Sequence, residues 1–179
     1  AVAGGYTIHD GSGGPYLFQG VKFHPATMVD LTNPAAVAWA QGVMSQGLAE
    51  GADGWMADYG EWLPTDARLA SGEDALAVHN RYPVDWARYN RDLFAAAPAS
   101  SIPRIAFMRA AWIHSQPLVQ VLWGGDQQTD FTDGDGFPSV IPMGIGLGVT
   151  GFPYFGTDIA GYQSALPQPT DEELFYRWT

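Results

Sequence analysis

The sequence contains no cysteine, so it can build neither a disulfide framework nor a thiolate metal site. Its four histidines are scattered and form no pair at helical metal-binding spacing, and we expect neither a metal nor another cofactor. Positive charge is scarce as well: eight Lys and Arg stand against 19 Asp and Glu, which gives a net charge of −11. Because such a surface repels phosphate backbones and anionic headgroups, we expect neither nucleic acid nor a membrane as partner.

Long apolar runs are also absent, since none reaches the ~18 residues that a membrane-spanning helix needs. Residues 1–5 lack the basic segment and the apolar stretch of a signal peptide, and the first residue is not Met. We therefore expect the sequence to begin partway through a longer protein. Within it, 46% hydrophobic and only 15% charged residues favour a packed globular unit over a disordered chain.

Helical and strand-like patterns alternate along the chain. A hairpin and a loop are expected over residues 5–31. Apolar residues recur at helical spacing over 34–50, 84–97 and 139–148, and a further helix is expected from residue 171 on. Short apolar runs at 28–31, 54–58, 105–109, 118–123 and 151–156 predict strands. The alternation predicts an α/β fold with a parallel sheet and no internal domain boundary.

Charged residues follow four of the predicted strands near the point where each strand ends. They are Asp58, Arg109, Asp126 and Asp158. In a (β/α)₈ barrel the carboxyl ends of the strands converge on the active site, so these four side chains would meet in one pocket. Two carboxylates are what glycoside hydrolysis needs, one to attack the anomeric carbon and one to protonate the leaving oxygen. Because strand ends commonly carry polar residues, the pattern alone leaves the question open.

The motifs around these residues are more specific. The run GWMADYGEWLPTD at residues 54–66 resembles the nucleophile segment of glycoside hydrolase family 31, in the wording of the subgroup typified by sulfoquinovosidases. The run WGGDQ at 123–127 resembles that family's acid/base segment. The runs FMR at 107–109 and TDIAGY at 157–162 fall where the family has its Arg and its DIGG(F/Y) motif, although Ala160 replaces the usual Gly. The resemblance covers essentially the whole chain.

The resemblance implies a partial (β/α)₈ TIM barrel, roughly strands 3 or 4 to 7 with their helices. Residues 1–179 would form the central part of the catalytic barrel. Asp58 would be the nucleophile and Asp126 the general acid/base of a retaining mechanism. The residues expected to bind the sugar are Arg109, Trp123, Trp55, Tyr59 and Asp158. Trp55 suits the barrel core equally well, and Glu61 is expected to orient loop backbone.

The expected function is hydrolysis of α-glycosides, with sulfoquinovosides as the substrate class that the subgroup suggests. An α-glucosidase or α-xylosidase is the alternative within the family. From another class, a metal-dependent barrel hydrolase would use Asp58, Asp126, Asp158 and His114 as ligands. A third interpretation is an inactive fragment, because part of a barrel exposes open sheet edges. The compartment and the oligomeric state stay open, and the subgroup resemblance slightly favours the cytoplasm.

Overall fold

The computed structural model describes residues 1–18, 25–162 and 169–179. Helices and strands alternate along most of this length, as the sequence predicts. In chain order the elements are the 3-10 helix η1 (Val2–Gly4), α1 (Pro34–Ala49), β1 (Gly54–Ala57), α2 (Ala75–Val78), the 3-10 helix η2 (His79–Arg81), α3 (Tyr82–Ala96), β2 (Ile105–Met108), β3 (Val121–Trp123), α4 (Phe137–Val149), β4 (Phe155–Gly156) and α5 (Glu172–Trp178).

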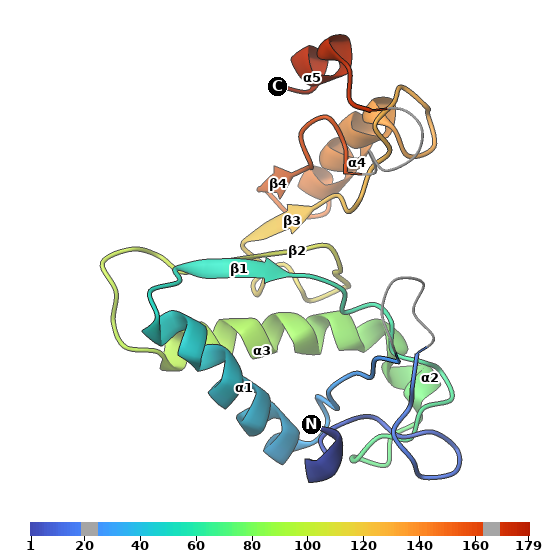
Figure 1. Ribbon diagram of the computed structural model, residues 1–179, viewed down its shortest axis with the longest axis vertical. Helices are drawn as coiled ribbons and strands as arrows, with labels where there is room; N and C mark the ends of the chain where they lie inside the picture. Colours follow the sequence, from blue (N-terminus) through green and yellow to red (C-terminus); the bar gives the residue numbers. More distant parts are fainter. Residues whose placement is uncertain (19–24, 163–168) are drawn as a thin grey trace.

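The four strands form one parallel sheet in the order β1-β2-β3-β4, so neighbours in the sequence are neighbours in the sheet. In Figure 1, α1 and α3 lie on the same side of β1, while α4 and α5 accompany the later strands at the other end of the molecule. This is an α/β fold consistent with part of a (β/α)₈ barrel. No helix in the described ranges is both long and apolar enough to cross a bilayer.

Local sequence fixes the limits of α1. The side chain of Asn33 accepts hydrogen bonds from the backbone N–H groups of Ala35 and Ala36, and Pro34 occupies the first turn, where its missing N–H costs nothing. After the helix, Gly51 adopts a φ of 105°, a left-handed conformation that turns the chain toward β1. The helix therefore ends where the sequence predicts.

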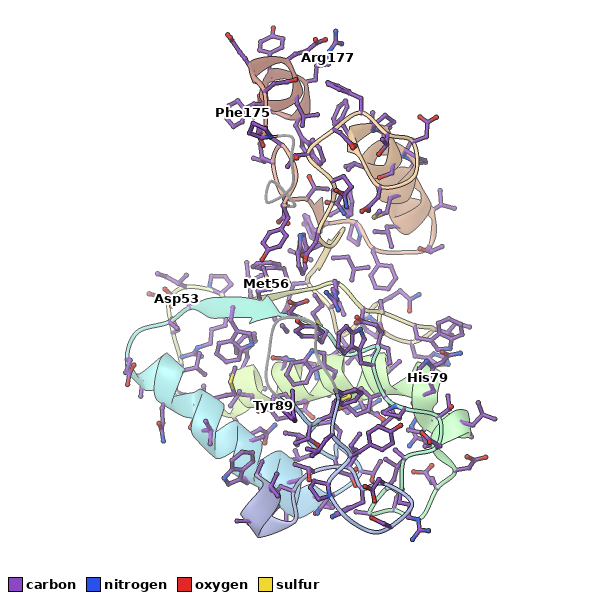
Figure 2. All side chains as sticks on the ribbon, turned by 45° about the vertical axis from the view of Figure 1, so that its right-hand side comes forward. Asp53, Met56, His79, Tyr89, Phe175 and Arg177 are labelled. Atoms are coloured by element: carbon purple, nitrogen blue, oxygen red, sulfur yellow. The ribbon has the colours of Figure 1, made fainter. Side chains whose placement is uncertain are left out.

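The main core lies between the sheet and α3. It gathers side chains from one face of the strands and the inner face of the helix, among them Ala57, Val84, Ala87, Phe94, Ala106, Met108 and Leu122. The opposite face of the sheet is less covered: Met56 and Ile105 are each 45% exposed. Figure 2 shows Met56 on the side of β1 away from α1 and α3. The uncovered face corresponds to the interior of a barrel that this half of the sheet cannot close.

Some predicted elements are shorter or different in the structure. In the run 118–123 only Val121–Trp123 is a strand, because the N–H groups of Leu118 and Val119 turn back to the carbonyl of Ser115. In the run 151–156 only Phe155–Gly156 pairs. Each of these short strands still ends at or just before a predicted site residue, Trp123 in one case and Asp158 in the other.

The predicted strand at 28–31 does not join the sheet. Val29 makes only an isolated antiparallel bridge to Thr7. The buried carboxylate of Asp30 accepts hydrogen bonds from the backbone N–H groups of Thr32 and Ala70, which bends the chain at this point. The hairpin turn is present, with His9 bridged to Pro15. The part of the expected loop at 19–24 lies outside the described residues.

Candidate active site

Register places three of the predicted site residues in one row across the sheet. β1 and β2 pair Ala57 with Met108, so one residue further on Asp58 comes level with Arg109. β2 and β3 pair Met108 with Leu122, which brings Arg109 level with Trp123. Because side chains alternate along a strand, this row faces away from the α3 core. The carboxyl ends of the strands thus present Asp58, Arg109 and Trp123 together.

The guanidinium of Arg109 makes the densest set of contacts in this row. Its Nε lies 3.3 Å from Oδ1 of Asp58. The same Nε donates a 3.0 Å hydrogen bond to Oε1 of Glu61, and Nη2 donates to the same oxygen. The guanidinium carbon also lies 4.4 Å from the ring centre of Tyr59, in cation–π geometry. One cation therefore joins two carboxylates and an aromatic ring from the loop after β1.

Charge at this cluster keeps Arg109 protonated. Burial alone would lower the pKa of Arg109, but the hydrogen bonds to Glu61 and the negative charges of Glu61 and Asp58 outweigh it and raise that pKa above its ordinary value. Asp58 is held from a second direction as well, because its Oδ1 accepts a 2.7 Å hydrogen bond from the backbone N–H of Tyr59. The carboxyl group is thus oriented by a backbone N–H and by a permanent cation.

The loop after β1 adopts a conformation that few residues tolerate. Tyr59 has a φ of 59° and Gly60 a φ of 97°. The tyrosine is therefore a non-glycine residue in the left-handed region, which costs of order 1–3 kcal/mol. A Cβ at Gly60 would lie 2.7 Å from Cδ1 of Trp86, so only glycine fits. This turn brings the side chains of Asp58 and Glu61 to the same guanidinium.

On the other side of the row, Trp123 reaches Asp158. Its indole Nε1 donates a 3.0 Å hydrogen bond to Oδ1 of Asp158, two residues beyond the end of β4. The second oxygen, Oδ2, is buried and has no hydrogen-bond partner among the described residues. A buried acceptor in that state is suited to a hydroxyl donor on a ligand.

The two predicted catalytic carboxylates both influence the pKa of Asp158. Burial raises that pKa above its ordinary value, the hydrogen bond from Trp123 opposes the rise, and the negative charges of Asp126 and Asp58 add to it. The negative charges of both carboxylates therefore act on Asp158. Asp126 follows β3 by three residues, on a loop that passes through Gly125 at a φ of 87°.

Trp55 does not join this group. Its Nε1 donates a 2.8 Å hydrogen bond to Oδ1 of Asn90, and its ring centre lies 4.7 Å from that of Phe94, both on α3. The alternation of β1 explains this placement: Trp55 and Ala57 face the helix, whereas Met56 and Asp58 face the other way. Of the two placements that the sequence left open for Trp55, the sugar site and the barrel core, the structure shows the core beneath α3.

Tyr59 remains beside Arg109, and the residue is 41% exposed. Glu61 was expected to orient loop backbone, but its described contacts are to the side chain of Arg109. In the sequence, Glu61 is marked only by its position three residues after Asp58 on the same loop. That position does not reveal Arg109, 48 residues further on, as its partner.

A hollow of about 370 Å³ adjoins the cluster. Its described borders include Glu61, Arg109, Trp112 and Gly124, but neither Asp58 nor Asp126. It therefore lies beside the carboxylates and does not coincide with them. Within the described part of the chain, no three His, Asp or Glu side chains are grouped so as to hold a metal ion, so the set of Asp58, Asp126, Asp158 and His114 is not assembled as a metal site.

Residues 1–179 match the family model described as the glycosyl hydrolases family 31 TIM-barrel domain. The chain belongs to glycosyl hydrolase family 31. A sulfoquinovosidase of Escherichia coli (strain K12) is 39% identical to it over 180 residues, which cover 99% of this chain and 26% of that protein. Among solved structures, a family 31 sulfoquinovosidase from E. rectale in complex with the aza-sugar inhibitor IFGSQ superposes with a TM-score of 0.91 at 39% identity, over 98% of this chain and 26% of that one.

Another similar solved structure is named for a different substrate. A cycloalternan-degrading enzyme from Trueperella pyogenes, solved in complex with a covalent intermediate, superposes with a TM-score of 0.80 at 31% identity, over 99% of this chain and 24% of that one. The chain thus spans about a quarter of the length of each of these three proteins.

Proposed function

We propose that residues 1–179 form the central part of the catalytic barrel of a retaining α-glycoside hydrolase, with Asp58 as nucleophile and Asp126 as general acid/base. The observation that carries the proposal is the placement of Asp58, Arg109 and Asp158 at the carboxyl ends of β1, β2 and β4 of one parallel sheet, with the charge of Asp126 acting on Asp158. Sites at this end of the strands are where barrel enzymes perform their chemistry.

Asp58 has the surroundings that a carboxylate nucleophile needs. Nucleophilic attack requires a correctly oriented carboxylate, and both the cation of Arg109 and the N–H of Tyr59 contact Asp58. Both contacts are made by Oδ1, so Oδ2 is the oxygen that we propose attacks the anomeric carbon. Bond formation at that carbon releases the aglycone oxygen and leaves a glycosyl ester on Asp58.

Asp126 supplies the proton in the first step and recovers it in the second. It protonates the departing oxygen as the glycosidic bond breaks, and it then takes a proton from the water that attacks the glycosyl ester. A retaining pair requires the two carboxyl groups to be about 5–5.5 Å apart, which we expect of Asp58 and Asp126.

The remaining groups are assigned to the sugar. Oδ2 of Asp158 would accept a hydrogen bond from a sugar hydroxyl, and the indole of Trp123 holds its carboxylate in place. Glu61 accepts hydrogen bonds from Nε and Nη2 of Arg109. We therefore propose that Nη1 of Arg109 donates to a hydroxyl group of the sugar. The exposed ring of Tyr59 offers an apolar face for sugar stacking.

Sulfoquinovosides are the proposed substrate class, because the relatives at 39% identity, one by sequence and one by structure, are named sulfoquinovosidases. Glucosides and xylosides are the alternative within the family. Comparing kcat/KM for the nitrophenyl α-glycosides of sulfoquinovose, glucose and xylose on the full-length protein decides between them. A preference for either neutral sugar would overturn the substrate assignment and leave the mechanism standing.

The mechanism has its own test in Asp58→Ala with added azide. Azide is small enough to enter the space left by the carboxylate and attack the anomeric carbon directly. We expect a glycosyl azide whose anomeric configuration is inverted relative to the substrate, identified by proton NMR coupling. Wild-type turnover in Asp58→Ala would contradict the assignment of the nucleophile. The assignment would also fail if no glycosyl azide formed and an Asp126 variant were inactive on every substrate.

A further inference from the structure

Gln127 is almost completely enclosed, with 1% of its surface exposed. Its side chain folds back along its own loop, and Nε2 donates a 2.5 Å hydrogen bond to the carbonyl oxygen of Gly124. Its backbone N–H donates to the carbonyl of Gly125 at 3.2 Å. Residues 124–127 are therefore closed into a compact loop, and Asp126 is the residue between the two glycines and the side chain that closes it.

The same residue fastens this loop to the neighbouring turn. The carbonyl oxygen of Gln127 accepts a 2.9 Å hydrogen bond from the N–H of Tyr162. The turn itself is closed by a 2.8 Å bond from the N–H of Gly161 to the carbonyl of Asp158. A Cβ at Gly161 would lie 2.7 Å from the carbonyl oxygen of Gln128, so turn and loop are in direct backbone contact. Gln127 thus joins the loop of Asp126 to the turn of Asp158.

We propose that Gln127 is a positioning residue for Asp126, which holds the general acid/base at the angle and distance that proton transfer to the leaving oxygen requires. This inference rests on the proposed function. Proton transfer falls off steeply when donor and acceptor leave hydrogen-bonding geometry. A loop that carries two glycines, one of them at a φ of 87°, has little stiffness of its own, so the side chain of Gln127 supplies it.

The chemical identity of the side chain supports this role. Oε1 of Gln127 is buried without a hydrogen-bond partner among the described residues. A buried acceptor left in that state costs stability, which an apolar side chain of the same length would avoid. Among the described residues this amide hydrogen-bonds only through its donor, and that donor binds the carbonyl oxygen of Gly124, which closes the loop around Asp126.

The test compares Gln127→Met with Asp126→Asn and with a matched control in the full-length protein. Gln41→Met is that control, because Gln41 also donates Nε2 to a backbone carbonyl, that of Tyr89 at 3.3 Å, far from the site. Each variant is assayed on an alkyl and on an activated aryl α-glycoside. A loss of acid positioning slows departure of the alkoxide and spares the aryl oxide, whereas general loosening of the fold slows both.

We expect Gln127→Met to lower kcat/KM, which reports the bond-breaking first step, at least tenfold more on the alkyl glycoside than on the aryl glycoside, with Gln41→Met like wild type. Gln127→Glu, which keeps the length but loses the donor at neutral pH, gives the same comparison if the Met variant does not fold. Equal losses on both substrates in Gln127→Met, while Asp126→Asn remains selective for the alkyl one, would overturn this inference alone. Equal losses in both Gln127→Met and Asp126→Asn would overturn the proposed function with it.

Discussion

Nε of Arg109 lies 3.3 Å from Oδ1 of Asp58, although the two residues follow different strands of the sheet. The parallel register of β1 and β2 produces this contact, because it sets the first residues beyond each strand level with one another. The guanidinium is shared with Glu61, so Asp58 receives only part of its charge. A nucleophile must be ionised yet still reactive, and a shared cation meets both demands better than an exclusive ion pair.

Removing the competing charge should therefore lower activity. In Glu61→Gln the guanidinium is free to pair more closely with Asp58, which makes that carboxylate a weaker nucleophile. We expect kcat to fall about 10- to 100-fold, the equivalent of the roughly 1.5–3 kcal/mol that a hydrogen bond to a charged group contributes. The measurement is kcat on an activated aryl glycoside, where formation of the glycosyl ester needs little acid assistance.

Glu73→Gln is the control for this change. Glu73 also accepts two hydrogen bonds from one guanidinium, that of Arg81, here through both of its oxygens at 2.8 and 2.9 Å, on the exposed surface away from the site. Its loss should leave kcat unchanged. If both Gln variants show the same kcat and the same unfolding temperature, Glu61 contributes only a structural ion pair.

Gly60→Ala should disturb the turn that brings Asp58 and Glu61 together. The new Cβ would meet Trp86 at 2.7 Å and occupy a φ of 97°, so both a clash and backbone strain are expected. We predict a loss of about 1–3 kcal/mol in the free energy of unfolding, together with lower kcat. Gly72→Ala separates the two causes, because Gly72 has a φ of 74° but open space around it. Equal destabilisation in the two variants would leave the contact with Trp86 without effect.

The sequence predicted which residues follow the strand ends better than it predicted the surroundings of individual side chains. Asp58, Arg109 and Asp158 could be placed together because strand ends in a parallel fold converge, whichever residues pack behind them. The side taken by Trp55 could not be predicted, since the run 54–58 is apolar on both faces and its register is fixed only by pairing with β2. The contact of Glu61 with Arg109 likewise depends on the left-handed turn at Tyr59, a conformation that its side chain does not favour.

Asp158→Asn should stabilise the protein at neutral pH. The pKa of Asp158 is raised in the folded state, so folding favours its protonated form. The corresponding stability is fully present below the ordinary value of 3.8 and is lost as pH rises through the folded pKa. An Asn at this position never acquires the charge, so its unfolding temperature should exceed that of wild type at pH 7, by an amount worth less than about 1 kcal/mol because the group is partly screened by solvent.

The gap in unfolding temperature should narrow as the pH is lowered from 8 to 4.5. Asp133→Asn removes one negative charge from the exposed loop before α4 and corrects for the change in net charge. A gap that stays constant with pH, or that Asp133→Asn reproduces, would show that the environment of Asp158 is not responsible.

Asp126→Asn should slow the first step of the reaction on some substrates and the second step on all of them. A general acid matters in proportion to how poorly the departing oxygen carries negative charge. Alkyl and glyceryl oxygens are poor leaving groups, so the first step should slow by about 10²–10⁴-fold on their glycosides, and activated aryl glycosides should lose little in that step.

The second step needs the same residue as a base, whichever glycoside was cleaved. On aryl substrates the variant should therefore show a burst of phenol followed by slow turnover, and the glycosyl ester on Asp58 should accumulate and appear in the intact-protein mass. Azide, which attacks without deprotonation, should restore the second step and give a glycosyl azide of retained configuration. Equal slowing of alkyl and aryl substrates, with neither burst nor trapped ester, would make Asp126 a binding residue and require another acid.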